Sequence, residues 1–295
     1  MRQWDGDARR SGGVVFWALD GAEGRRSGNH VGGSSKVAWV VVFFLGAVTG
    51  SFLNVCIFRI PKGESIIRPR SHCLLCQNPI RWHDNIPLFS FFFLKGRCRW
   101  CRAKISRQYP VIEGLTALFF LLYYGCYGLS VKGVVTLGLT LALLVMSVID
   151  WRHQILPDGI TLPGIAVGFI VSGCWPGLQG ELSPLQGLKA SFFGILLGGG
   201  LLYAAGTLAE KILKKEAMGG GDVKLLAMIG AFTGWAGVWW TLFVSSLAGS
   251  IVGIYLRLRT GQEKIPFGPY LALGAFTYIW FGGRVIGWYV QSMGF

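Results

Sequence analysis

The chain has 295 residues, of which 52% are hydrophobic and only 14% are charged, and its mean hydropathy is +0.50. This composition excludes an ordinary soluble domain and indicates several membrane-spanning helices, each of about 20 apolar residues. The formal charge of +14 could indicate a nucleic-acid binder, but the basic residues gather in the links between apolar segments, as positive-inside topology predicts.

The chain begins with a polar segment and then an apolar one. Residues 1–36 are rich in Gly, Ser, Arg and Asp and lack apolar periodicity, so we expect a disordered tail. Residues 37–58 are apolar and long enough to cross a bilayer, whereas the apolar core of a cleaved signal peptide is shorter. We therefore predict that the first transmembrane helix spans 37–58.

Residues 59–108 form the only sizeable polar segment between apolar stretches. They contain eleven Lys or Arg residues and two acidic residues, Glu64 and Asp84. By the positive-inside rule this segment is cytoplasmic, which places the tail before residue 37 on the outer side.

Two C-x2-C pairs lie in this cytoplasmic segment, Cys73 with Cys76 and Cys98 with Cys101. Each pair can hold one metal ion from a tight turn, and the cytosol is reducing, so zinc is favoured over disulfides. Four thiolates leave no open coordination position, so we predict a structural zinc rather than a catalytic one. The other cysteines lie in or at the ends of apolar segments and are interpreted as packing residues: Cys56, Cys126 and Cys174.

The rest of the chain, 109–295, predicts seven more spans. The resulting fold class is an all-α polytopic membrane protein with about eight transmembrane helices and a small cytoplasmic zinc-binding module between the first two. The sixth and seventh spans share few residues, so one of them is expected to be short or tilted. The predicted spans are 109–129, 133–150, 159–175, 187–208, 222–235, 238–256 and 268–288.

Two aspartates lie at the cytoplasmic membrane edge of this topology. Asp150 ends the third span, and Asp222 follows the glycines of 219–221 at the start of the sixth. Taken singly, an aspartate at a helix start is usually an N-cap, and a glycine triplet is common in membrane helices. Together, however, they predict a pair of carboxylates that can act as general base and general acid, as in aspartic proteases. Asp158, in the same link as Asp150, is the weaker candidate.

Other catalytic patterns find little support. His72, His83 and His153 are interpreted as solvated loop residues, and the chain contains neither H-E-x-x-H nor G-x-S-x-G. This argues against a zinc protease and against a serine hydrolase.

Several ordered blocks make the chain similar to one family. The segment 218–224 contains the G-x-G-D motif of intramembrane aspartic proteases, and the four cysteines and the Asp150–Asp158 link fit the same pattern. With these motifs the chain resembles the type IV prepilin peptidases over about residues 46–269. Further matching blocks are Gly50–Val55, Arg59–Pro61, Asp84–Pro87, Tyr109–Pro110 with Glu113, and Pro266–Pro269.

The resemblance implies a bifunctional enzyme of the bacterial inner membrane, with residues 109–295 as the peptidase domain. Such an enzyme cleaves the leader of prepilins or pseudopilins at the cytoplasmic face and then methylates the new N-terminal amine with S-adenosylmethionine. By motif position, Asp150 and Asp222 correspond to the catalytic pair. The expected partners are these substrates and membrane lipid, without nucleic acid.

Two other classes of function are compatible with parts of the sequence. A transporter or proton channel could use the paired aspartates as an ion site, although a zinc-binding cytoplasmic module is less expected there. A membrane-anchored nucleic-acid binder would fit the charge of the cysteine module but would leave the aspartates unexplained.

Overall fold

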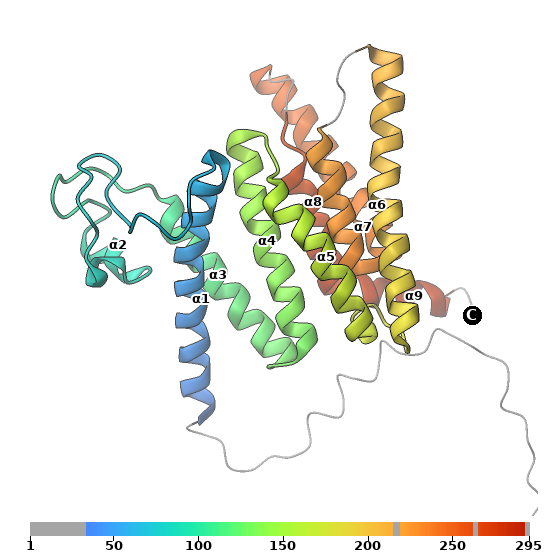
Figure 1. The fold of residues 1–295 in the computed structure, drawn as a ribbon, viewed down its shortest axis with the longest axis horizontal. Coiled ribbons are helices and arrows are strands. Elements are labelled where there is room, and N and C mark those ends of the chain that lie inside the picture. The colour runs from blue at the N-terminus through green and yellow to red at the C-terminus, as the bar shows by residue number, and fades with distance from the viewer. Residues whose placement is uncertain (1–33, 215–218, 262–264, 293–295) are drawn as a thin grey trace, which may run out of the picture.

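The computed structural model describes residues 34–214, 219–261 and 265–292 (Figure 1). These residues form helices joined by loops, except that the module of residues 59–108 is largely irregular and contains two isolated β-bridges. Most of the predicted tail, residues 1–33, lies outside the described residues. The α-helices are α1 (Ser34–Arg59), α2 (Phe89–Phe93), α3 (Gln108–Tyr127), α4 (Val131–His153), α5 (Asp158–Cys174), α6 (Pro184–Leu213), α7 (Gly220–Thr260), α8 (Gly268–Thr277) and α9 (Gly283–Ser292).

The long helices confirm an all-helical, multi-pass membrane protein. Among the described residues, five helices are long and apolar enough to cross a bilayer, and α5 is a shorter apolar helix of 17 residues. The five candidate spans are Lys36–Lys62, Gln108–Tyr127, Val131–His153, Pro184–Ile212 and Gly220–Arg259.

Helix α7 is divided at Gly234. Gly234 has a left-handed φ of 68° with ψ of −172°, a conformation that favours glycine, and it lies between the predicted spans 222–235 and 238–256. The carbonyl of Ala231, one turn earlier, accepts hydrogen bonds from the hydroxyls of Ser172 and Ser191 and from the Gln179 amide. Side chains thus solvate the irregular backbone inside the bundle, as a lipid environment requires.

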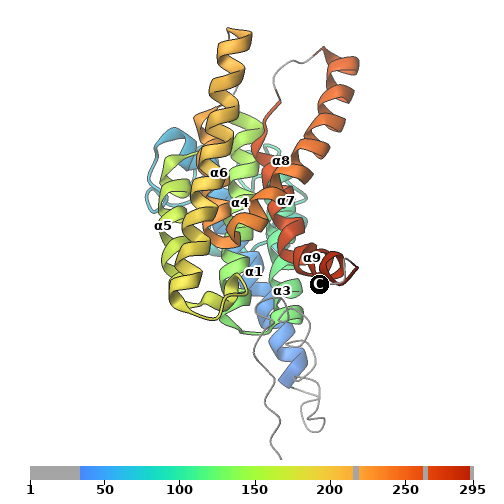
Figure 2. The ribbon, with the colours of Figure 1, turned by 90° about the vertical axis from the view of Figure 1, so that its right-hand side faces the viewer.

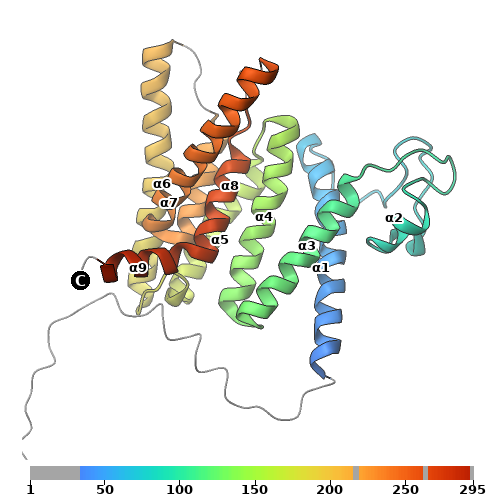
Figure 3. The ribbon, with the colours of Figure 1, turned by 180° about the vertical axis from the view of Figure 1, so that it is seen from behind.

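The C-terminal segment differs from the single span predicted at 268–288. Helix α8 passes through a π-helical turn, Tyr278–Gly282, and α9 then leaves at an angle to it (Figure 3). The adjacent Gly282 and Gly283 and the π turn account for the change of direction, because such features are common causes of helix kinks.

Two buried apolar clusters hold the helices together. The larger joins α4, α7 and α8 through residues such as Met146, Leu225 and Leu271. The smaller packs α1 and α3 against α4 through residues such as Ile57 and Ile149. Helix α4 belongs to both clusters and therefore fixes the position of α1 relative to the remaining bundle (Figure 2).

The ends of the helices decide where polar residues meet. The last turns of α1 and α4 and the first turns of α5, α7 and α8 lie at the same end of the bundle, uppermost in Figure 1. The polar module of residues 59–108 connects α1 to α3 and projects sideways from α1 (Figure 1). Both predicted aspartates therefore reach one end of the molecule.

Candidate active site and metal centre

Asp150 lies in the last turn of α4 and is only 5% exposed. Its Oδ2 atom accepts a hydrogen bond of 2.9 Å from the backbone N–H of Gly268 at the start of α8. Pro269 follows at the first helical turn, where a missing N–H is tolerated, so the sequence favours a helix start at this point. The exposed N–H groups of that helix start stabilise a carboxylate.

Gly268 leaves no room for a side chain. A Cβ atom built on it would lie 2.7 Å from Oδ2 of Asp150. In the sequence, Gly268 is marked only by the prolines on either side of it, at 266 and 269. The residue that it contacts, Asp150, lies 118 positions earlier in the chain. Sequence reasoning therefore did not assign it a role.

If Asp150 is catalytic as the sequence predicts, Gly268→Ala should lower the predicted peptide cleavage at least about tenfold, because displacing a reacting group by a fraction of an ångström is costly. Initial cleavage rates at equal amounts of inserted protein measure the effect. Gly138→Ala is the matched control, since Gly138 also lies in a membrane helix but a Cβ atom there meets nothing within 4 Å. Equal rates for the two variants would contradict the contact between Gly268 and Asp150.

Asp222 lies in the first turn of α7, after the N-cap Gly219. Gly221 packs so closely against the α4–α5 link that a Cβ atom would lie 2.9 Å from Cβ of Leu156. The charge of Asp150 acts directly on Asp222, and Oδ1 of Asp222 is buried without a hydrogen-bond partner among the described residues. The structure thus brings the two predicted aspartates close together at one end of the bundle.

Asp158, the weaker candidate, does not join this pair. It begins α5, and both of its carboxylate oxygens accept hydrogen bonds from Lys224 Nζ, at 2.7 and 2.9 Å. The two side chains are 56% and 40% exposed, so Asp158 links α5 to α7 in a solvated ion pair.

Asp158→Asn is expected to change the cleavage rate less than about fivefold, because an exposed ion pair contributes about 1 kcal/mol or less. Lys224→Gln breaks the same pair from the other side and serves as the control, with an effect of similar size. Steady-state cleavage of a prepilin peptide measures both. A loss for Asp158→Asn as large as that for Asp222→Asn would place Asp158 among the reacting groups.

The four predicted metal ligands converge. Their sulfur atoms all lie within 4.8 Å of one another, with Cys73 Sγ 3.8 Å from Cys101 Sγ and Cys76 Sγ 4.0 Å from Cys98 Sγ. Each pair sits in a turn that is closed by backbone bonds, from Gln77 N–H to the Cys73 carbonyl and from Arg102 N–H to the Cys98 carbonyl. The module therefore has a site that could hold a metal ion.

Hydrogen bonding favours the thiolate form at Cys73, whereas desolvation and the neighbouring thiols raise the pKa of the Cys101 thiol to about 11. The backbone N–H of Cys76 hydrogen-bonds the Cys73 sulfur and lowers the pKa of that thiol to about 6. Thiolates are the form that binds metal.

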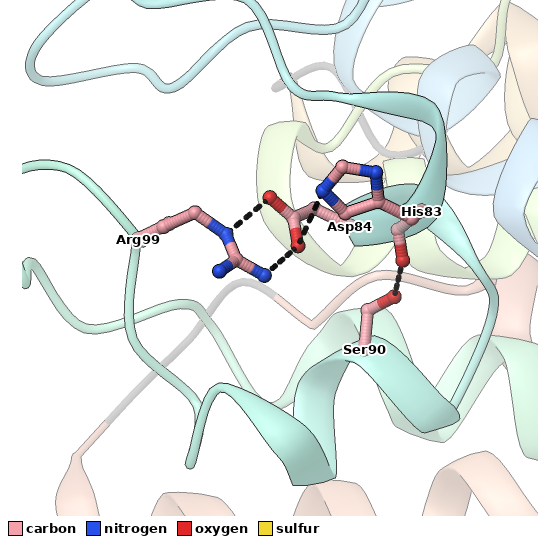
Figure 4. Close-up of polar contacts among 4 residues, drawn as sticks. All are labelled: His83, Asp84, Ser90 and Arg99. Carbon is pink, nitrogen blue, oxygen red and sulfur yellow. Dashed lines mark hydrogen bonds and ion pairs between the residues drawn. The ribbon is translucent and has the colours of Figure 1, made fainter.

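The histidines and charged residues of the module form a structural network. Asp84 accepts two hydrogen bonds from the Arg99 guanidinium, which lowers the pKa of the Asp84 carboxyl, and the Ser90 hydroxyl donates to the His83 carbonyl at 3.1 Å (Figure 4). The His72 ring hydrogen-bonds the Arg70 carbonyl, and His153 is exposed at the end of α4. These histidines therefore give no sign of a second catalytic centre.

A cavity of about 1120 Å³ lies between the module and α1. Phe44 and Phe89 contribute to its apolar wall, while Asp84, Arg97 and Arg99 are among its polar lining residues. It contains neither aspartate of the pair and is therefore separate from their site.

Comparison with known proteins agrees with this arrangement. Residues 44–127 match the family described as Bacterial Peptidase A24 N-terminal domain, and residues 137–254 match the Type IV leader peptidase family. No solved structure matches the chain.

Curated relatives cover most of the chain. A prepilin leader peptidase/N-methyltransferase of Pseudomonas putida is 35% identical over 278 residues, covering 85% of this chain and 93% of that protein. The protein of the same name from Pseudomonas aeruginosa is 35% identical over 289 residues, which cover 89% of this chain and 97% of that protein. A type 4 prepilin-like proteins leader peptide-processing enzyme of Escherichia coli is 39% identical over 80% of this chain and 91% of that protein. With both matched regions in order and this similarity over most of its length, the chain belongs to the type IV leader peptidase family.

Proposed function

We propose that this chain cleaves the leader peptides of prepilins or pseudopilins and then N-methylates the new N-terminal residue. The observation that carries the proposal is the meeting of two carboxylates, the buried Asp150 and the half-buried Asp222, at one end of a membrane helix bundle. Ionisable groups inside membrane segments are costly and usually functional. The names of the relatives supply the substrate class and the second activity.

In the proposed cleavage step the two carboxylates share one proton, because two like charges this close cannot both ionise favourably. The hydrogen bond from Gly268 stabilises negative charge on Asp150, so the shared proton is assigned to Asp222. Asp150 takes a proton from water as the water oxygen bonds to the scissile carbonyl carbon, and Asp222 gives its proton to the carbonyl oxygen. When the C–N bond breaks, Asp150 passes a proton to the departing amine and Asp222 recovers one from the hydroxyl group.

The second step needs the free amine that the first step creates. S-adenosylmethionine, when bound, would supply the methyl group for displacement by the neutral amine nitrogen, which would then release one proton. Such a displacement depends on holding nitrogen, carbon and sulfur in line, so positioning makes a large contribution to the rate.

The cysteine cluster fits a structural zinc. A tetrahedral zinc with Zn–S distances of about 2.3 Å separates its sulfur ligands by about 3.8 Å. The two sulfur pairs at 3.8 and 4.0 Å agree with this spacing. Cys73, Cys76, Cys98 and Cys101 would hold the ion, which would fold the module and leave no position for substrate.

For the topology, we propose eight spans in the bacterial inner membrane, with the aspartate pair and the module on the cytoplasmic side and residues 1–36 outside. The division of α7 at Gly234 supports two short spans within 220–260. The basic residues of 59–108 support the orientation.

Incubating the purified protein in lipid vesicles with a prepilin tests the proposal. A shift of the substrate to smaller size is expected, and serine-protease inhibitors and chelators should leave short-term cleavage intact. An intact prepilin, together with proton flux through the same vesicles, would instead support the channel reading.

A further inference from the structure

Glu113 is a buried acidic residue of α3 that the proposed cleavage step does not use. It lies near the start of α3 and is only 6% exposed. A carboxylate in this position is expensive unless other groups hydrogen-bond it. Its partners therefore indicate what it does.

The partners of Glu113 come from two parts of the chain. The Oε2 atom accepts a hydrogen bond of 2.7 Å from the backbone N–H of Leu88, in the module, and the Ser51 side chain of α1 also hydrogen-bonds the carboxylate. Helices α1 and α3 pack tightly beside this residue, where a Cβ atom on Gly50 would lie 2.7 Å from Cα of Glu113. One carboxylate thus connects α1, α3 and the module.

Leu88 is an unusual residue for this contact. Its φ of 62° and ψ of −53° lie in a region that non-glycine residues rarely adopt, and it immediately precedes α2. Such a conformation persists only where surrounding contacts hold it. The Leu88 side chain also approaches Gly114 of α3, and the ring of Phe89 stacks on Phe44 of α1 at 6.0 Å between centroids.

These contacts fix the module to the membrane helices at its apolar helix α2. The two matched family regions separate the module from the aspartate pair. Both aspartates of the pair lie in 137–254, whereas Glu113 and the four cysteines lie in 44–127. Removing the Glu113 contact would therefore release the module and leave the aspartate pair in place.

We propose that Glu113 is a positioning residue that anchors the cysteine module on α1 and α3 and thereby sets the geometry for methyl transfer. The inference rests on the proposed methyltransferase activity. The Oε2 atom of Glu113 accepts the hydrogen bond from the Leu88 N–H, and the strained turn at Leu88 directs α2 onto Phe44.

Two substitutions of Glu113 test the anchor. Glu113→Ala removes the acceptor, whereas the matched Glu113→Gln keeps a carbonyl oxygen for the Leu88 N–H. Glu113→Ala is expected to lower kcat for methyl transfer to a pre-cleaved pilin about tenfold or more. Cleavage of prepilin should stay within about twofold, because that variant removes no group of the proposed cleavage step. Glu113→Gln should retain most methyl transfer, and bound zinc should be equal in all three proteins.

Contact between the module and α1 can be measured by cross-linking, without any enzyme assay. Phe44→Cys with Phe89→Cys should be joined by a short bismaleimide in the otherwise unchanged chain, and adding Glu113→Ala should strongly reduce this cross-link. An unchanged cross-link would overturn the anchor, as would wild-type methyl transfer by Glu113→Ala. Absence of methyl transfer in the wild-type protein would instead overturn the proposed second activity, and the cross-link would still decide the anchor.

Discussion

Asp150→Asn and Asp222→Asn are each expected to lower kcat for leader cleavage by about 10²- to 10⁴-fold, the range that general acid–base groups contribute. Asparagine has nearly the shape of aspartate, so helix packing around α4 and α7 should persist. Its amide can neither take the proton of water nor share a proton with the other carboxylate. Single-turnover cleavage of a prepilin peptide by inserted protein measures the loss.

Asp158→Asn is the control for this prediction, since it makes the same chemical change at the exposed ion pair with Lys224. Both variants of the pair should also fail to methylate uncut prepilin, because no free amine forms. They should still methylate a pilin supplied without its leader. Cleavage at the wild-type rate by either variant would exclude the aspartate pair.

Cys73→Ser or Cys98→Ser should reduce methyl transfer about tenfold or more while cleavage falls less. Loss of one thiolate weakens the metal site and loosens residues 59–108, because a module with little core depends on its metal to fold. No atom of the proposed cleavage step is removed. The assay supplies the mutant with pre-cleaved pilin and S-adenosylmethionine and compares methyl incorporation with its cleavage rate on prepilin.

Cys126→Ser is the matched control, because Cys126 is an exposed cysteine of α3 outside the cluster. It should leave zinc content and both reactions unchanged. Wild-type methyl transfer together with lost cleavage in Cys73→Ser would assign the module to the peptidase instead.

Local patterns in the sequence were enough to predict the parts of the site that short segments define. The spacing of the cysteine pairs predicts a tetrahedral cluster, and the four sulfur atoms do converge. The apolar segments place Asp150 and Asp222 at one edge of the membrane, and the structure brings them together. Likewise, the turn expected near residue 235 coincides with the left-handed Gly234.

Contacts between distant segments were not predictable in this way. The hydrogen bond from Gly268 to Asp150 depends on where α8 begins relative to α4, and that of Leu88 to Glu113 depends on how the module folds back onto α3. Neither periodicity nor motif spacing reports such tertiary geometry. The ion pair between Asp158 and Lys224 is a further case, because it joins α5 to α7.

The most direct test of the aspartate pair is the affinity of a transition-state mimic. A peptide of the prepilin cleavage site with a hydroxyethylene group in place of the scissile amide places a hydroxyl where the tetrahedral oxygen forms. It should bind the wild-type protein at least about 100-fold more tightly than the matched peptide with a methylene group there. Asp150→Asn and Asp222→Asn should lose that advantage while binding the methylene peptide as before. An advantage that survives in both variants would contradict catalysis by Asp150 and Asp222.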